Sequence, residues 1–213
     1  MPRSALDPLL ERRQDLANRT RACVNIRLPI LVGGLFFVAA CASPPVSETT
    51  GVRARAEIRG CGDSDVTGQA TLRERPSEEG VKLVDISIEV RGLSDGKHAV
   101  HVHETGQCEP CSAAGGHHDP GPFGKSSPDA PDYNHPFHGG DLVNIEVVDG
   151  YGMLETTSSR IALSSGRLSV FDEDGSAIII HTNPDAYCDQ EDELTPGCAG
   201  GSRDACGVIV LEN

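Results

Sequence analysis

Short segments in which apolar and polar residues alternate constrain the fold of this chain more than any other feature of its sequence. The clearest is residues 84–91, where Val, Ile, Ile and Val occupy the even positions and polar or charged residues lie between them. Residues 52–58 repeat the pattern. A period of two is typical of half-buried β-strands, and no window sustains the 3.6-residue period of a helix. The sequence therefore predicts an all-β fold.

Turn signals separate these two segments from further strand candidates. Gly- and Asp-containing turns occur at 60–63, 94–96, 149–150 and 174–175. The other candidates are 66–73, 98–104, 142–148, 152–157, 177–181 and 207–212. Together they predict an eight-stranded antiparallel Greek-key β-barrel or sandwich. Two stretches, 105–141 and 182–204, are too long for hairpin turns, and we expect them to be functional loops.

The first 40 residues are predicted to be a targeting segment. Six Arg in residues 1–27 precede a 13-residue apolar run, 28–40, which is too short to span a bilayer comfortably. Small residues then lead to Cys41, as in a bacterial lipoprotein signal, where this Cys is lipidated and begins the mature chain. An ordinary secretory signal or a buried helix is the alternative.

These segments predict three parts of the chain and a location. Residues 1–40 form the signal, 41–51 a flexible Pro-containing tether, and 52–213 the folded domain. Either kind of signal exports the protein. We expect it in the periplasm or cell envelope, lipid-anchored to a membrane through Cys41.

The charge of the chain excludes some partners. Its net charge is −14, and without residues 1–40 it becomes −17, from 12 basic and 29 acidic residues. A basic face for phosphates is not expected on such a chain, so we predict no nucleic-acid partner and no electrostatic binding to an anionic membrane surface.

Six cysteines remain after Cys23 and Cys41 are set aside: Cys61, Cys108, Cys111, Cys188, Cys198 and Cys206. In an exported domain they indicate disulfides, for which fifteen complete pairings exist. A thiolate zinc site would need two Cys-x-x-Cys units, and only Cys108 and Cys111 have that spacing.

All eight histidines lie between residues 98 and 181. His101 and His103 flank one residue of a predicted strand, so their side chains leave the same face about 6.6 Å apart, which suits two ligands of one metal. The other candidates are His117 in a Gly-rich loop, His135 and His138 with Asp141, and His181 at the end of an apolar strand. Imidazoles without thiolate suit copper or zinc, and a carboxylate among them favours zinc.

Two histidines are expected to lie outside this set. His98 belongs to the same predicted strand as His101 but faces its other side, so we interpret it as a core residue that supports the ligands. His118 is predicted to be a surface residue of its loop.

Five segments, in this order, resemble the copper/zinc superoxide dismutase family over roughly residues 52–213. They are GKHAVHVHE at 96–104, SAAGGHHDP at 112–120, HGGDLVN at 138–144, IIIH at 178–181 and GSRDACGVI at 201–209. The resemblance, to the bacterial, exported, lipoprotein-type members, implies dismutation of superoxide to oxygen and hydrogen peroxide by a copper centre bridged through a histidine to zinc.

The resemblance also implies roles for individual residues. The implied copper ligands are His101, His103, His117 and His181, and the implied zinc ligands are His117, His135, His138 and Asp141. His117 would bridge the metals and return a proton during catalysis. Arg203 would dock superoxide at the mouth of the copper channel. Asp185 matches an aspartate that links copper and zinc ligands by hydrogen bonds.

The chain departs from the family pattern at several points. No histidine follows Pro120 at the usual place of the third zinc histidine, and His135 is the one candidate, at a shifted position. The family's Gly-Arg before the last copper strand is replaced by EDGS at 173–176. The loop 182–204 carries six acidic residues, Asp185 among them, against Arg203 alone, which predicts weak attraction of an anionic substrate.

The resemblance assigns Cys206 to a disulfide with the segment ahead of His117. Cys108 and Cys111 both qualify, and an exported bacterial lipoprotein favours Cys108. We expect Cys188 to pair with Cys198 across the acidic loop, which leaves Cys61 with the remaining partner.

Two other classes of function compete with an enzyme. A non-enzymatic copper-binding or copper-buffering envelope protein on the same fold would keep the four copper histidines without needing Arg203. An adhesion-type sandwich would need no ordered histidines at all. The presence of Arg203 favours the enzyme. The sequence leaves open whether the protein is a monomer or a homodimer.

Overall fold

A computed structural model describes residues 51–120, 135–187 and 199–212 of the chain, all within one compact unit, Ser47–Asn213. Its elements are β1 (Arg53–Gly60), β2 (Thr67–Pro76), β3 (Lys82–Arg91), β4 (Gly96–His98), β5 (Val100–His103), the 3-10 helix η1 (Cys111–Ala114), β6 (Ile145–Val148), β7 (Tyr151–Ser158), β8 (Ala177–His181) and β9 (Arg203–Leu211). Within the described ranges no helix has the length and apolar character needed to cross a membrane. The all-β prediction is confirmed.

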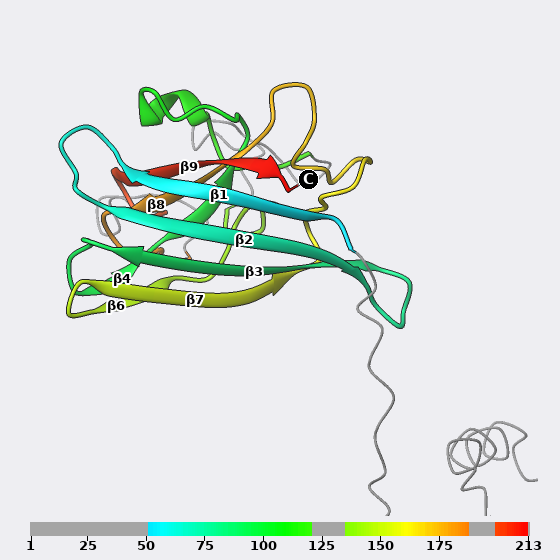
Figure 1. The fold of residues 1–213 in the computed structure, drawn as a ribbon, viewed down its shortest axis with the longest axis horizontal. Helices are drawn as coiled ribbons and strands as arrows, with labels where there is room; N and C mark the ends of the chain where they lie inside the picture. The colour runs from blue at the N-terminus through cyan, green and yellow to red at the C-terminus, as the bar shows by residue number, and fades with distance from the viewer. Residues whose placement is uncertain (1–50, 121–134, 188–198, 213) are drawn as a thin grey trace, which may run out of the picture. The chain divides into compact units, whose positions relative to one another are not determined.

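The nine strands form one antiparallel sheet in the order β4-β6-β7-β3-β2-β1-β9-β8-β5. Its two end strands, β4 and β5, are consecutive in the chain, so the sheet curls into a nearly closed barrel. Figure 1 shows β1, β2, β3 and β7 side by side as one wall, with β8 behind them.

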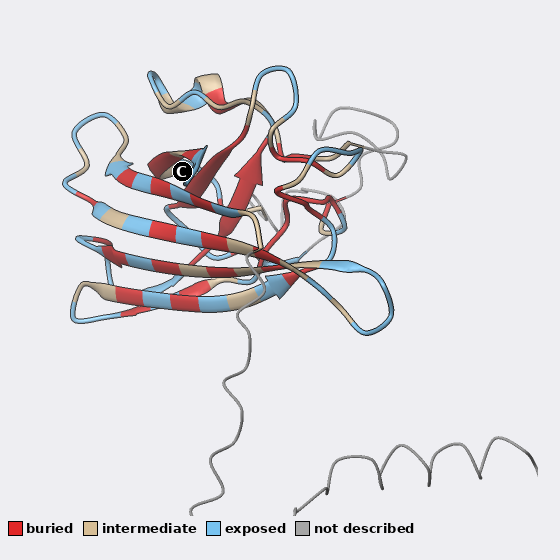
Figure 2. Ribbon diagram, turned by 45° about the vertical axis from the view of Figure 1, so that its right-hand side comes forward, coloured by how far each residue is buried: buried red, intermediate tan, exposed pale blue. Residues whose placement is uncertain are grey.

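The alternation in the sequence becomes the two faces of this wall. In β1, Ala54, Ala56 and Ile58 are fully or almost fully buried, whereas the residues between them are exposed. In the strand β3 the buried residues likewise alternate with half-buried or exposed ones, and Figure 2 shows this alternation along the strands of the wall. A period of two places alternate side chains on opposite faces of a pleated strand, so the sequence pattern alone predicts which residues form the core.

The predicted strand 98–104 is two strands, which corrects the expected number from eight to nine. His98 pairs with Ile145 in β6, whereas Val100 pairs with Ile180 in β8. Between them, Ala99 donates its N–H to the carbonyl of Asn183. The chain therefore passes from one end of the sheet to the other at this residue, and a continuous polar-apolar pattern does not reveal the change of partner.

Two segments of the loop 105–141 lie on β5 and extend the sheet there. His117 forms an isolated antiparallel bridge with His103, and Asp141 forms one with His101. Gly140 makes the second approach possible, because a Cβ at this position would lie 2.1 Å from the carbonyl oxygen of Val102. The loop thus places two candidate ligands beside the two histidines of β5.

Candidate metal centre

Four buried histidines converge at β5. His101 and His103 come from this strand, His181 from the end of the neighbouring β8, and His117 from the loop bridged to His103. One ligand atom from each can be chosen so that all four atoms lie within 4.8 Å of one another. We call these residues the four-histidine cluster. They are the four copper ligands implied from the sequence.

Backbone carbonyls fix the orientation of two of these rings. His103 donates Nδ1–H to the carbonyl of Gly115 at 2.9 Å, and His181 donates Nδ1–H to that of Gly201 at 2.9 Å. In each ring the other nitrogen, Nε2, is left to face the cluster. The Nε2 of His181 lies 3.1 Å from Nδ1 of His101. The Nε2 of His103 is buried and has no hydrogen-bond partner among the described residues.

A second cluster adjoins the first and shares His117. It contains His117, His135, His138 and Asp141, whose ligand atoms also lie within 4.8 Å of one another. We call it the aspartate cluster, because Asp141 contacts the other members. Its Oδ1 lies 2.6 Å from Nδ1 of His117, and its Oδ2 lies 3.0 Å from Nδ1 of His138. These are the implied zinc ligands, and His135 belongs to the group despite its shifted place in the sequence.

Asp185 connects the two clusters. One carboxylate oxygen, Oδ2, accepts a hydrogen bond from Nε2 of His101 at 2.9 Å, and the other accepts one from Nε2 of His135 at 3.0 Å. The side chain is fully buried, so this acidic residue of the loop 182–204 lies inside the site, where both of its oxygens are hydrogen-bonded to histidines.

Asn144 is a residue of this site that the sequence analysis did not single out. Its side-chain amide donates to the backbone carbonyl of Asp185 at 3.0 Å, and its side-chain oxygen accepts from the backbone N–H of Asp185 at 2.8 Å. Asn144 therefore fixes the backbone that carries the connecting carboxylate. Its place three residues after Asp141, in the segment HGGDLVN, is the one signal that the sequence offered.

Burial favours the neutral form of three histidines of the four-histidine cluster. It lowers the pKa of His103 well below the usual range, that of His117 to about 4 and that of His181 to about 3. Positive charge on neighbouring rings lowers these values further. A metal ion binds the neutral imidazole, so these three rings favour the protonation state that a cation needs.

The aspartate cluster has the opposite electrostatic character. Burial raises the pKa of Asp141, but hydrogen bonds from His117, His135 and His138 outweigh it and lower that pKa far below its usual range. Burial has the opposite effect on a histidine and lowers the pKa of His135. Its hydrogen bonds with Asp141 and Asp185 outweigh burial and raise this pKa to about 9. This cluster is thus built around an ionised carboxylate.

Arg203 begins β9 and extends toward η1. Its Nη1 donates to the carbonyl of Cys111 at 2.5 Å, and its Nη2 donates to the carbonyl of Gly115. Gly115 also accepts the hydrogen bond from His103. The arginine implied from the sequence therefore lies next to the four-histidine cluster and shares a backbone carbonyl with one of its members.

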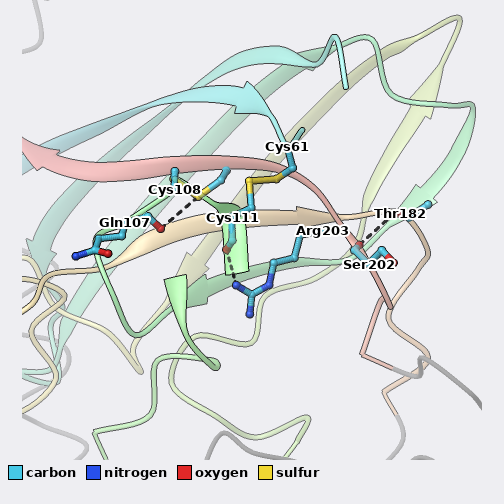
Figure 3. The surroundings of a disulfide bond; sticks show 8 residues. Cys61, Gln107, Cys108, Cys111, Thr182, Ser202 and Arg203 are labelled. Carbon is cyan, nitrogen blue, oxygen red and sulfur yellow. Dashed lines mark hydrogen bonds between the residues drawn. A yellow bond between two sulfur atoms is a disulfide. The ribbon is translucent and has the colours of Figure 1, made fainter. Parts of the chain in front are cut away.

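Two disulfides stabilise this part of the molecule. Cys108 is bonded to Cys206, the pairing that the sequence analysis favoured, and Cys61 is bonded to Cys111. Figure 3 shows the second bond beside the guanidinium of Arg203. Cys188 and Cys198, predicted to pair, lie outside the described residues, as does the predicted lipidation site Cys41.

The two histidines outside the clusters have different outcomes. His98 is buried, and its ring nitrogens lie 2.8 Å from the carbonyl oxygen of His181 and 2.9 Å from that of Ser94, so its supporting role in the core is confirmed. The prediction for His118 is wrong. This residue is 2% exposed, and its backbone lies between two segments, since its N–H donates to the carbonyl of Val102 and its carbonyl accepts from the N–H of Gly140.

Comparison with known proteins finds one family. A sequence profile described as copper/zinc superoxide dismutase (SODC) matches residues 66–209. A protein named "Superoxide dismutase [Cu-Zn]" from Deinococcus radiodurans is 37% identical over 70% of this chain and 79% of the relative. One of the same name from Caulobacter vibrioides is 38% identical over 70% of this chain and 80% of the relative.

Two further matches extend over nearly the whole length of the matched protein. "Extracellular superoxide dismutase [Cu-Zn]" from Drosophila melanogaster is 28% identical over 85% of this chain and 98% of the relative. A crystal structure of the clock protein EA4 superimposes with a TM-score of 0.59 at 26% identity and covers 77% of this chain and 97% of the other. The barrel described above is thus shared with a protein solved experimentally.

Proposed function

Because this chain belongs to the copper/zinc superoxide dismutase family and catalyses the dismutation of superoxide to oxygen and hydrogen peroxide, we propose that its two metals bind in the two clusters that share His117. Copper is assigned to the four-histidine cluster and zinc to the aspartate cluster. The single observation that carries this assignment is the shared residue, since one imidazole has two ring nitrogens and can join two metals.

The donor atoms fit these metals. The four-histidine cluster offers only imidazole nitrogens, which suit copper, and the aspartate cluster adds the carboxylate that favours zinc. The buried Nε2 of His103, without a hydrogen-bond partner among the described residues, is the kind of polar atom that a ligand is expected to satisfy. When bound, copper supplies the one-electron redox change, and zinc fixes the geometry of the shared imidazole.

Residues of the chain perform the remaining steps. Arg203 attracts and orients the superoxide anion through its charge and its N–H groups. Peroxide formation also needs protons. In this proposal His117 holds one at the ring nitrogen that faces the four-histidine cluster, while Asp141 retains the other nitrogen at 2.6 Å. Asp185 fixes the orientation of the His101 and His135 rings relative to each other, because it accepts a hydrogen bond from each.

Substitution of His181 by Ala tests the assignment. The variant loses one copper ligand and leaves the aspartate cluster intact, so we expect copper and dismutase activity to be lost while zinc and the barrel are retained. Metal analysis, activity and circular dichroism of the purified protein measure these outcomes. Full activity with one copper per chain in the His181→Ala protein would contradict the assignment.

We also propose that the protein is exported and anchored in the cell envelope. The basic region, the apolar run 28–40 and Cys41 support lipidation, with residues 41–51 as a tether and 52–213 as the catalytic domain. A relative named extracellular is consistent with export. Mass spectrometry of the N-terminal peptide from the native host tests the proposal. A lipid-modified Cys41 supports it, and an unmodified chain that retains residues 1–40 contradicts it.

A further inference from the structure

The outward faces of β1 and β2, which lie side by side in the wall of Figure 1, carry a concentration of positive charge. Five arginines alternate with buried residues on these strands, against one outward-facing acidic residue, Glu57. We call this surface the arginine face; it consists of Arg53, Arg55, Arg59, Arg73 and Arg75. We propose that the arginine face docks on the anionic headgroups of a phospholipid membrane. The choice of a membrane rests on the proposed anchoring through Cys41.

The arginine face differs in sign from the rest of the chain. Outside residues 1–40 the chain has 12 basic and 29 acidic residues. Five of the basic residues but only Glu57 among the acidic ones lie on the arginine face, so its net charge is +4. The seven basic and 28 acidic residues elsewhere sum to −21. The net charge of the chain predicted no such face, because a sum does not show where the charges lie.

Three of the arginines have no acidic partner. Arg53, Arg55 and Arg73 form no ion pair with a described residue. Arg53 is directly opposite Arg73 in the register of β1 and β2, and like charges in this arrangement destabilise a sheet. The Nε of Arg73 is also buried without a hydrogen-bond partner among the described residues. Phosphate oxygens would supply both the missing negative charge and the missing acceptors.

The other two arginines are paired. Arg59 forms an ion pair with Glu57, and Nε of Arg75 lies 2.6 Å from Oδ2 of Asp85 on β3. Further acidic residues lie at the edges of the arginine face: Glu89 on β3 and Glu212 after β9. The positive field is therefore strongest around the three arginines without an acidic partner.

The place of the arginine face in the chain identifies the partner as a membrane. Arg53 lies 12 residues after Cys41, and 12 extended residues span at most about 43 Å. A lipid on Cys41 would thus keep the arginine face close to the headgroups and raise their effective concentration.

Docking in this orientation is compatible with the acidic remainder and with catalysis. Each basic residue next to an anionic leaflet is attracted to it, and the attraction falls off within a Debye length of about 8–10 Å. Acidic residues on the far side of the barrel are therefore largely screened. No residue of the arginine face belongs to either metal cluster, and β5 is three strands away from β1 in the sheet, so docking leaves the clusters uncovered.

Co-sedimentation with vesicles tests the proposal on the metal-loaded compact unit, residues 47–213, which lacks Cys41. At about 0.1 M salt we expect half of the protein to bind at about 1 mM vesicle lipid containing phosphatidylglycerol, the strength that four net charges provide. Vesicles of phosphatidylcholine alone should not bind it. Because the unit carries no lipid, the result is independent of the anchoring, which the N-terminal peptide tests separately.

Charge reversal locates the binding surface. Arg55→Glu/Arg73→Glu changes the net charge of the arginine face from +4 to zero, so binding to the anionic vesicles should be lost while metal content is unchanged. Lys97→Glu/Arg167→Glu is the matched control, because it makes the same change in total charge at exposed positions outside the arginine face. The control should bind within about threefold of the wild type.

Four outcomes would overturn the proposal. The wild-type unit could fail to bind anionic vesicles, or the two double variants could lose binding equally, which would make total charge the cause. Binding to a short DNA duplex but not to vesicles would assign the arginine face to a nucleic acid. Self-association in sedimentation velocity that Arg55→Glu/Arg73→Glu abolishes, without vesicle binding, would assign it to a second copy of the chain.

A milder variant covers the case in which the charge-reversed protein does not fold. Arg53→Gln/Arg55→Gln removes two charges at exposed positions of β1, so vesicle binding should weaken by about 25-fold, or about fivefold for each arginine. Unchanged binding in this variant would contradict the proposal as well.

Discussion

The four-histidine cluster and the aspartate cluster share His117 but are held in different ways. In the first, three of four residues are on strands of the barrel, and two rings are oriented by backbone carbonyls. In the second, all four residues come from the loop 105–141, and Asp141 contacts the other members. The difference indicates that the sheet preforms the four-histidine cluster, the proposed copper site, whereas the aspartate cluster, the proposed zinc site, depends on one carboxylate.

The largest effect should come from removing the charge of that carboxylate. Asp141→Asn keeps the size of the side chain but replaces an anionic ligand by a weakly coordinating amide, so we expect zinc affinity to fall by about 100-fold. Copper affinity should change by less than about threefold, because only His117 is common to both clusters. Competition with a chelator measures both affinities. Equal loss of the two metals would show that the clusters do not differ as described.

A smaller, symmetrical effect is expected at Asp185, which contacts one ring of each cluster. Asp185→Asn removes one charge and can no longer accept hydrogen bonds with both terminal atoms, so the affinities for copper and zinc should each fall by about 10-fold. Asn144→Ala, which frees the backbone of Asp185, should reproduce the same pattern more weakly. A loss confined to one metal would contradict the connecting role of Asp185, and the same chelator titration detects it.

Glu74, on β2 and outside both clusters, tests whether stability of the barrel can be changed without changing the metals. Burial raises its pKa, but hydrogen bonds from Ser164 and Leu163 outweigh this and lower the pKa below 4.5. Since the folded-state pKa is depressed, these bonds stabilise the protein above the ordinary carboxyl pKa, and the stability is lost as the pH falls through the folded value.

We therefore expect Glu74→Gln to lower the free energy of unfolding by about 1 kcal/mol at neutral pH and by less below about pH 4. Denaturant unfolding at several pH values measures the difference. Copper and zinc content should equal those of the wild type. A destabilisation that grows on acidification would contradict the account of Glu74.

The smallest effect is expected from salt. With a net charge of −17 outside residues 1–40, we expect long-range attraction of superoxide to be weak, whereas the proposed contact with Arg203 is short-ranged and is screened least. Dismutase activity should therefore change by less than about twofold, or rise, as ionic strength increases from about 0.01 to 0.15 M. A steep decline would mean that basic residues elsewhere guide the substrate.

The sequence predicted the strand-built half of the molecule better than the loop-built half. A period of two is a local property, so it located the core of β1 and β3 and the common face of His101 and His103. This period did not predict the break between β4 and β5 at Ala99, because a change of pairing partner does not alter the local sequence pattern. The burial of His118 and the hydrogen bonds between Asn144 and Asp185 were not predicted either, because both depend on contacts between distant segments.

The aspartate cluster was predicted by resemblance rather than by spacing. Nothing local in the sequence shows that His135 approaches His138 and Asp141, because the approach depends on how the loop folds back on β5. Cys61 is a similar case, since its pairing with Cys111 was reached by assigning the other cysteines first. Loop geometry of this kind is set by tertiary contacts and not by periodicity.

X-ray absorption at the copper and zinc edges of the purified, metal-loaded protein tests the central claim most directly. The two-cluster assignment predicts copper surrounded by imidazole nitrogens alone, and zinc surrounded by imidazole nitrogens with one carboxylate oxygen, at about 2.0–2.2 Å. A sulfur ligand at about 2.3 Å on either metal, or a zinc environment without carboxylate oxygen, would contradict it.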